Sequence, residues 1–327
     1  MRVPRILEGA AGVVTRVGTQ DLMALHDGSG WVCAVGRGGT LLLSLDAGAR
    51  WRRAAEGPWV NGKGLLGLEG GLLVAGDQAF YHSADGGASW EERSSGAERF
   101  SRFNSLMALT GTEAELFTVD TTHNSKSDES SAAILRSTDG GRGWTTVWYD
   151  GNYGRIEGLA VAGRGQVVAT QRSGVLWSLD SGASWHPTGL ELQPGAVHGC
   201  PDGTAYVLGS RGVLLKGRAG AAWRRVLDRP DLRLTAVWAD GAGALAVVGE
   251  AGLLVSSADG GSSWIRHPTG LTTRLTAVRR IPGALLAVGP GGVVVRVADC
   301  GAGSNLCKSP SGKNRRRQNP RANEVCQ

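Results

Sequence analysis

Three arginines occupy turn positions in the sequence where their guanidinium groups could act together. Arg37 lies in VGRGG, Arg172 in TQRSG and Arg211 in GSRG. A guanidinium presents a planar fork of donors that matches a carboxylate or a phosphate. If the fold brings these turns to one rim, the arginines predict recognition of an anionic group. The alternative is that each arginine is an ordinary soluble turn residue.

A second candidate set combines aromatic rings with charged groups in three short segments of the first half of the chain. Aromatic residues and arginine are over-represented where binding energy concentrates. The same rings also suit packing between structural elements. The set comprises Trp59, Arg99, Arg102, Trp148, Tyr149, Asp150, Tyr153 and Arg155. Together with the three arginines, it predicts an off-centre binding site.

The sequence offers little for catalysis or metal binding. No pair of carboxylates stands out in the way that an ordinary glycosidase requires. The five cysteines show no zinc or redox spacing. Cys33 and Cys200 fall in apparent strands, where we expect small buried hydrophobes. We therefore predict no catalytic residues, no metal and no cofactor.

A repeat of about 40 residues must position the candidate residues. Its signature is Ser-x-Asp-x-Gly-x-x-Trp, and the Asp positions recur at intervals of 38 to 54 residues. Two further copies are degenerate, with Arg218 at the Asp position of one and no Trp after Asp299 in the other. The five complete copies are Ser44-Asp46-Gly48-Trp51, Ser83-Asp85-Gly87-Trp90, Ser137-Asp139-Gly141-Trp144, Ser178-Asp180-Gly182-Trp185 and Ser257-Asp259-Gly261-Trp264.

The residue types of the signature predict a hairpin turn that is structural. The Asp carboxylate accepts hydrogen bonds from backbone N–H groups of its own turn. Gly allows a positive φ, and the Ser hydroxyl adds a local hydrogen bond. Trp supplies a large apolar plate to fill space against a neighbouring element. We interpret the Asp as a structural residue and not as a catalytic one.

The repeat predicts an all-β fold. In the copy from Leu234 to His267, the strands LTAVWAD, ALAVVGE and GLLVSSAD precede the turn, and SWIRHP follows it. Four short strands in each of seven repeats predict a seven-bladed β-propeller of four-stranded antiparallel blades over residues 1–301. A spare strand at residues 12–17 is predicted to pair into the seventh blade and close the ring, since closure removes sheet edges.

The strand order also predicts two distinct faces. The signature turns join the third and fourth strands of each blade. The turns between the second and third strands, and the links between blades, then lie on the opposite face. We expect function there, because loops on a rigid scaffold carry binding residues. A polar insertion, Thr121–Ser131, is predicted as a long loop on that face.

Charge and hydropathy indicate which classes of partner to expect. Residues 302–327 form a basic, polar tail that we expect to be disordered, and the segment from Cys300 onward carries five of the six net positive charges. The body is nearly neutral, so we expect no nucleic-acid partner beyond weak contacts of the tail. No apolar run approaches a membrane span, and the start lacks a convincing signal peptide. We expect a cytoplasmic monomer.

The repeat resembles a known family. The pattern LTAV…AVVGE-x-G-LLVSS-x-DGG-x-SW is similar to the BNR/Asp-box propellers, and most similar to their photosystem II stability/assembly factor-like branch, over roughly Asp21 to Gly301. The resemblance implies a seven-bladed binding protein that assists membrane-protein assembly without hydrolysis. Arg280-Ile281-Pro282 resembles a sialidase motif, but it lies in the last repeat and not near the start, and we interpret that match as chance.

Two functions follow as hypotheses, and a third possibility is a purely structural domain in a larger assembly. The first is a non-enzymatic scaffold that engages a protein or peptide partner through the face opposite the Asp-box turns. The second is a carbohydrate-active propeller, either a sialidase-like hydrolase or a sugar-binding module. In the second case Trp59, Trp148 and Tyr153 stack on sugar rings, and Asp150 is the first acid to test.

Overall fold

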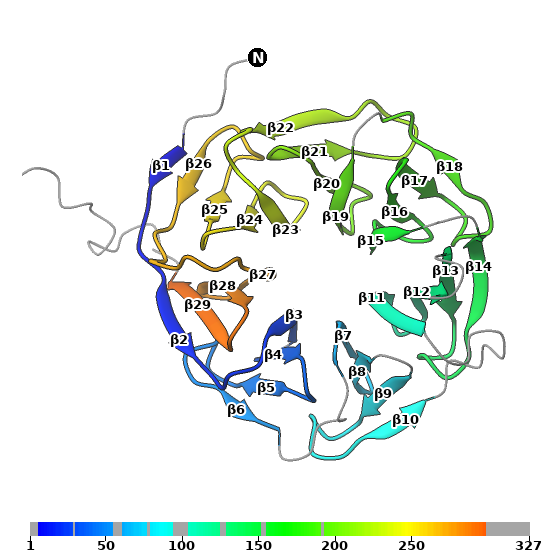
Figure 1. Ribbon diagram of the computed structural model, residues 1–327, viewed down its shortest axis with the longest axis horizontal. Coiled ribbons are helices and arrows are strands. Elements are labelled where there is room, and N and C mark those ends of the chain that lie inside the picture. The colour runs from blue at the N-terminus through cyan, green and yellow to red at the C-terminus, as the bar shows by residue number, and fades with distance from the viewer. Residues whose placement is uncertain are drawn as a thin grey trace, which may run out of the picture.

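A ring of sheets surrounds a central axis in the computed structural model (Figure 1). It describes residues 6–28, 30–54, 61–76, 79–93, 104–124, 129–151, 155–190 and 193–298. The regular secondary structure of these residues is entirely β, in seven sheets. The described residues include no helix long and apolar enough to cross a membrane.

The blades follow one another in chain order. Blade 1 contains β3 (Leu22–Gly28), β4 (Trp31–Gly36), β5 (Leu41–Ser44) and β6 (Arg52–Arg53), and blade 2 contains β7 (Gly64–Leu68), β8 (Gly71–Ala75), β9 (Phe80–Ser83) and β10 (Glu91–Arg93). Blade 3 contains β11 (Asn104–Thr112), β12 (Glu115–Asn124), β13 (Glu129–Ser137) and β14 (Thr145–Asp150), and blade 4 contains β15 (Ile156–Val161), β16 (Val167–Gln171), β17 (Gly174–Ser178) and β18 (His186–Pro187).

The second half of the chain continues the pattern. Blade 5 contains β19 (Pro194–Gly199), β20 (Ala205–Gly209), β21 (Val213–Gly217) and β22 (Arg224–Asp228), and blade 6 contains β23 (Leu234–Ala239), β24 (Leu245–Gly249), β25 (Leu254–Ser257) and β26 (Trp264–Arg266). Blade 7 contains β27 (Ala277–Ile281), β28 (Ala284–Gly289) and β29 (Val293–Ala298), and the N-terminal segment forms β1 (Ile6–Glu8) and β2 (Val13–Arg16).

Each blade contains four antiparallel strands, and the first of its own strands in chain order lies nearest the axis (Figure 1). The seven-bladed propeller predicted from the repeat is therefore confirmed. Because the strands alternate in direction, the signature turns all lie on one face, which we call the hairpin face. The turns between second and third strands, and the links between blades, lie on the other, which we call the link face.

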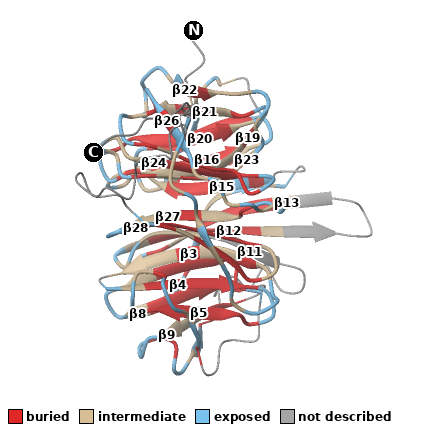
Figure 2. Ribbon diagram, turned by 90° about the vertical axis from the view of Figure 1, so that its left-hand side faces the viewer, coloured by how far each residue is buried: buried red, intermediate tan, exposed pale blue. Residues whose placement is uncertain are grey.

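The hydrophobic core lies between neighbouring blades and not in one central cluster. Buried side chains line the strands throughout the ring (Figure 2). They form separate apolar clusters, one at each of the seven interfaces between adjacent blades. The tryptophan of each hairpin joins the cluster that it shares with the preceding blade. In blade 3, for example, Trp144 stacks on Phe80 of blade 2, with ring centroids 4.4 Å apart.

The glycine of the hairpin is required for the same close approach. Gly48 has φ of 75°, and a Cβ there would lie 2.7 Å from the Leu286 side chain of blade 7. Gly141 has φ of 85°, and a Cβ would lie 2.9 Å from Leu73 of blade 2. Both the backbone conformation and the neighbouring blade therefore exclude a larger residue. Glycine and tryptophan together fit each hairpin against the preceding blade.

The N-terminal segment completes two blades. β2 pairs antiparallel with β29, from Val13 opposite Arg296 to Arg16 opposite Val293, and so supplies the fourth strand of blade 7. Blade 7 lacks a hairpin tryptophan, and its interface with blade 6 is filled in part by Ala10 and Val14. β1 adds in parallel to β26 as a fifth strand of blade 6, a pairing that the sequence analysis did not anticipate.

Candidate functional site

The hairpin residues use their polar groups within their own turns. In blade 4 the Ser178 hydroxyl donates to Asp180 Oδ1 at 2.9 Å and accepts from Gly182 N at 2.8 Å. Asp180 Oδ2 accepts from the Ser184 hydroxyl at 2.6 Å, and Oδ1 accepts from the Ser184 backbone N–H at 2.8 Å. These bonds hold the pKa of Asp180 at about 2.

The same geometry recurs in the other complete copies. Serine-to-aspartate distances are 2.8–2.9 Å in all five hairpins. Trp51, Trp144, Trp185 and Trp264 each donate Nε1–H to the backbone carbonyl of the hairpin glycine at 3.0–3.1 Å. Such turns fix structure and leave few polar atoms for a ligand, so binding groups must be sought elsewhere.

Blade 5 replaces this network with an ion pair. Arg218 occupies the position of the hairpin Asp, and its Nη2 lies 2.6 Å from Asp202 Oδ2. Its Nε also donates to the Thr204 hydroxyl at 3.1 Å. The degenerate copy therefore ties the hairpin turn to the turn between the first two strands of the same blade. The sequence shows that Arg218 replaces the signature Asp, but it does not show that Arg218 pairs with Asp202.

The three predicted arginines all lie on link-face turns, but on different blades and in different turns. Arg37 follows β4 in blade 1, and its side chain is 62% exposed with Nε 3.7 Å from Asp21. Arg172 forms a two-residue turn with Ser173, between Gln171 and Gly174 of blade 4. Blade 1 is separated from blade 4 by two blades (Figure 1). The arginines share a face without forming one uniform ring.

Arg211 has the most developed surroundings of the three. It follows Ser210 in the turn of blade 5 and adopts φ of 57°, a left-handed conformation that is uncommon for a residue with a side chain. A groove of about 430 Å³ surrounds it, and its wall includes Trp223 and Arg225. The other lining residues are Leu190, Gly209, Ser210, Val213, Leu215, Asp228 and Pro230.

This groove lies between the outer parts of blades 4 and 5. Trp223 is half-buried and meets Trp177 of blade 4 edge-on, with ring centroids 6.1 Å apart. Both Arg211 and Arg225 are exposed, and Arg225 pairs with Asp228 at 2.7 Å. The groove thus combines an aromatic wall, aliphatic side chains and an exposed guanidinium. Those groups suit a segment that carries both apolar and acidic residues.

The aromatic residues predicted in the link after blade 3 lie partly in a strand. Trp148, Tyr149 and Asp150 belong to β14, the outer strand of blade 3. Trp148 is half-buried and packs against the cluster between blades 3 and 4, which is the packing role that the sequence left open for these rings. Tyr149 is 58% exposed. Asp150 is half-buried and has an interaction partner.

Arg155 lies in the link between blades 3 and 4 and is among the described residues. It precedes β15, its side chain is 64% exposed, and its Nε lies 2.9 Å from Glu157. Tyr149, Arg155, Arg172 and Arg211 therefore all lie on or beside the link face of blades 3 to 5. Four other predicted site residues, Trp59, Arg99, Arg102 and Tyr153, lie outside the described residues.

The polar insertion of blade 3 is paired rather than looped. β12 and β13 continue their antiparallel register to Asn124 opposite Glu129. The polar composition of Thr121–Ser131 predicts a loop, but backbone pairing extends along most of this segment. Residues 125–128 lie outside the description. The insertion is therefore a strand extension at the turn between the second and third strands.

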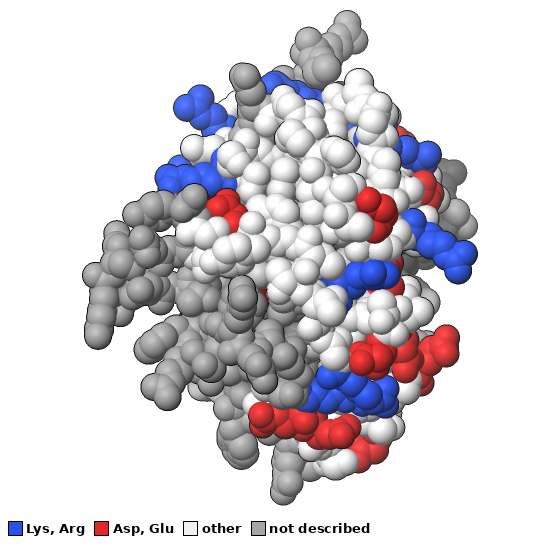
Figure 3. Space-filling model, turned by 90° about the vertical axis from the view of Figure 1, so that its right-hand side faces the viewer, with Lys and Arg blue, Asp and Glu red and all other residues white. Residues whose placement is uncertain are grey.

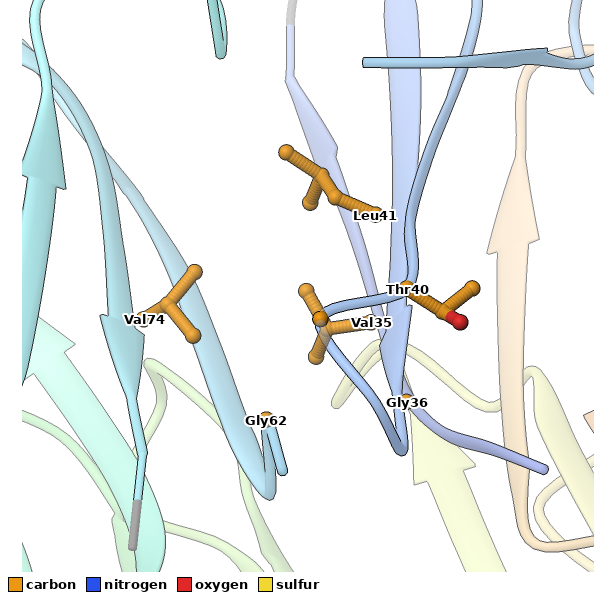
Figure 4. Close-up of a pocket in the computed structure, with 7 residues that line it drawn as sticks. Val35, Gly36, Thr40, Leu41, Gly62 and Val74 are labelled. Atoms are coloured by element: carbon orange, nitrogen blue, oxygen red, sulfur yellow. The ribbon is translucent and has the colours of Figure 1, made fainter. Parts of the chain in front are cut away.

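Two other surface features do not resemble binding sites. An apolar cavity between blades 1 and 2, lined by Val35, Thr40, Leu41 and Val74, has about 10 Å³, room for about one water molecule (Figure 4). The side of the ring shown in Figure 3 has acidic and basic side chains next to each other in its lower part and a largely uncharged upper part. Mixed charge of this kind does not concentrate a strong potential of one sign.

Sequence reasoning missed Trp223 and Arg225 as candidate site residues. Trp223 was visible as the last residue of the degenerate hairpin KGRAGAAW. The signal that could have found it is the replacement of Ser and Asp by Lys216 and Arg218, which marks blade 5 as different. No motif in the sequence indicates that its indole borders a groove with Arg211.

No protein-family model and no curated protein matches the sequence. Solved structures match the fold. YCF48 bound to D1 peptide superposes with a TM-score of 0.71 at 17% identity, covering 93% of this chain and 100% of that one. YCF48 from Cyanidioschyzon merolae gives 0.66 at 15% identity, covering 88% and 99%. The GH74 xyloglucanase from Xanthomonas campestris gives 0.61 at 17% identity, covering 87% of this chain and 53% of that one. At these identities the likeness establishes the fold alone.

Proposed function

We propose that this propeller is a protein- or peptide-binding module that engages an extended acidic segment on the link face of blades 3 to 5. We further propose kinship with the BNR/Asp-box propellers of the assembly factor-like branch. The observation that carries the proposal is the groove that the exposed Arg211 and Trp223 both line. The shared fold with a propeller solved in complex with a peptide supports it.

The proposed recognition divides between charge and apolar contact. Arg172 and Arg211 on adjacent blades offer bidentate donors to carboxylates of the partner. Trp223 and Leu190 offer apolar surface for the residues between those carboxylates. Tyr149, exposed at the rim, extends the same surface toward blade 3. Catalysis has no part in this function.

A binding measurement on a defined peptide panel tests the proposal. Labelled peptides with acidic residues spaced among apolar ones are compared by fluorescence polarisation with matched peptides in which Gln and Asn replace Glu and Asp. We expect the acidic peptides to bind. The double variant Arg172→Ala/Arg211→Ala should weaken that binding roughly tenfold or more, because charged hydrogen bonds are lost.

The matched control is Arg50→Ala, which removes an exposed arginine from the hairpin face. Both variants should melt within a few degrees of the parent, since exposed substitutions cost little. Equal affinity of the parent and the double variant for the acidic peptides rejects the proposed site. Equal binding of acidic and neutral peptides rejects the proposed chemistry.

The carbohydrate-active alternative is supported by the xyloglucanase likeness, which covers about half of that enzyme. The exposed Tyr149 is a candidate for stacking on a sugar ring. Thermal-shift screening against oligosaccharides and turnover assays with aryl glycosides distinguish this function from peptide binding. A saturable sugar response that Tyr149→Ala abolishes favours the alternative.

A further inference from the structure

The innermost strands of four consecutive blades place a second group of candidate side chains around the axis of the ring. Arg279 lies on β27, Asp27 and His26 on β3, and His198 on β19, while Trp238 lies on β23. Figure 1 shows these strands side by side around the centre of the ring. The histidines, Asp27 and Trp238 occupy the later half of their strands, which run toward the hairpin face.

Arg279 lacks a full set of partners. Its Nε donates to the Leu25 carbonyl at 3.3 Å and lies 3.7 Å from Asp27 Oδ1. Among the residues that the structure describes, no hydrogen bond reaches Nη1 or Nη2 of this guanidinium. The side chain is 28% exposed, so a solute can reach it.

The two histidines beside Arg279 are uncharged at neutral pH. Burial, reinforced by the charge of Arg279, lowers the pKa of His26 to about 3 and that of His198 to about 4. His198 Nε2 lies 2.9 Å from the Ala239 carbonyl, so Nε2 carries the proton and donates it. His26 Nδ1 is buried with no hydrogen-bond partner among the described residues. The guanidinium therefore carries the positive charge of this group at neutral pH. Its Nη atoms and His26 Nδ1 have no hydrogen-bond partner among the described residues.

Of this group, His26 also lines a surface groove on the hairpin face. The groove has about 720 Å³ and extends over blades 2 and 3 to Arg142. Arg279 does not line it, and its lining includes Glu69, Glu113 and Asp139. The groove connects the axial end of β3 with solvent on the face opposite the proposed peptide site.

We propose that the Nη groups of Arg279 bind a carboxylate at the axis, on the hairpin-face side of the ring. A carboxylate accepts two parallel N–H bonds from such a fork. The neutral histidines and Trp238 surround the anion with rings that add no positive charge of their own. The carboxylate belongs to a free organic acid or to the end of a peptide chain. This inference does not rest on the proposed function, because none of its residues lies on the link face.

Calorimetric titration with succinate tests the proposal, with the neutral diamide of succinate as the matched probe. Succinate should bind saturably and the diamide should not. Arg279→Gln should weaken succinate binding roughly tenfold or more. Asp27→Asn should strengthen it about threefold or more, because a competing negative charge beside the guanidinium is removed. Arg211→Gln should leave it unchanged.

A second pair of probes identifies the source of the carboxylate. N-acetylated triglycine is titrated as the free acid and as the C-terminal amide. Binding of both succinate and the free acid indicates a site that admits a chain end, and binding of succinate alone indicates a small acid. Absence of saturable succinate binding overturns the proposal. So does unchanged affinity in a folded Arg279→Gln protein; if that variant does not fold, unchanged affinity in Asp27→Asn overturns it.

Discussion

At the scale of single residues, the serine hydroxyl of each complete hairpin both donates and accepts a hydrogen bond within its turn. Ser257 is 3% exposed, and its hydroxyl donates to Asp259 Oδ1 at 2.8 Å while accepting from Gly261 N at 2.9 Å. Removing the hydroxyl leaves a buried N–H without a partner, which costs about 1–3 kcal/mol. Ser257→Ala should lower the free energy of unfolding by that amount, measured by urea denaturation.

The matched control lies in the same turn. Ser262 is exposed and its hydroxyl donates to the Asp259 carbonyl at 3.0 Å. Ser262→Ala should change the free energy of unfolding by less than about 0.5 kcal/mol. Equal losses of unfolding free energy in the two variants would show that the buried Ser257 hydroxyl does not stabilise the turn.

Residue-level prediction from the sequence succeeded for local chemistry and was weaker for chemistry between blades. The Ser and Asp roles follow from positions two residues apart, so a sequence window contains all the partners. The pairing of Arg37 with Asp21 and the groove beside Arg211 depend on residues 12 or more positions away in the sequence. The sequence leaves Trp148 open between binding and packing, because an indole at the end of a strand suits a link or a core equally well.

At the scale of elements, the N-terminal strands close the ring without a covalent bond. β2 contributes four residue pairs to β29, whereas β1 contributes three to β26. Val14 enters the cluster between blades 6 and 7, but Leu7 on β1 is 49% exposed. Deleting residues 1–9 should therefore lower Tm by only a few degrees. Deleting residues 1–18 should lower it by roughly 10 °C or more, measured by calorimetry.

Point variants in β2 separate burial from backbone pairing. Val13 is 67% exposed and Val14 is half-buried, and both lie in the same four-residue strand. Val14→Asp should destabilise the ring and Val13→Asp should not, because only Val14 loses apolar contact. If the longer deletion melts like the full chain, ring closure by β2 is not a source of stability.

The elements themselves were largely predictable because a repeat shows the same pattern several times. Three or four strands in each copy had consistent spacing, so one clear copy indicated the others. β1 escaped notice because three residues, Ile6 to Glu8, carry no periodicity. The extension of β12 and β13 was taken for a loop because polar composition outweighed the antiparallel register that tertiary structure imposes.

At the scale of the whole molecule, the two axial histidines make the ring sensitive to acid. Their folded-state pKa values, about 3 for His26 and about 4 for His198, lie below the ordinary value of 6.5. The unfolded chain therefore binds more protons below pH 6.5, and stability falls as pH drops from 7 toward 4. At pH 5 each histidine should cost about 1–2 kcal/mol relative to pH 7.

Carboxyl groups modify this dependence without cancelling it. Burial raises the pKa of Asp120 to about 6, so between pH 6 and 4 the folded state binds its proton more tightly and gains stability. The hairpin carboxyls, whose pKa values are lowered, lose their contribution only below about pH 4. Between pH 7 and 5 the two histidines outweigh the single raised aspartate.

Substitution of one histidine tests this balance. In His198→Gln the amide nitrogen can still donate to the Ala239 carbonyl, but no proton is taken up on unfolding. The loss of unfolding free energy from pH 7 to 5 should shrink by about 1–2 kcal/mol. His186→Gln, at an exposed position of β18, should leave the loss as it is in the parent. An unchanged loss in His198→Gln would contradict the assignment of acid sensitivity to the axis.

The seam between β2 and β29 also determines how the ring responds to mechanical load. Val13, at the start of β2, pairs with Arg296, near the end of β29. Once β1 has detached, tension between the two ends of the chain acts on this one end of the antiparallel pair. The hydrogen bonds then break one after another, as in peeling, and are not loaded together in shear. Opening the ring at this seam therefore requires less force than breaking the same hydrogen bonds together in shear.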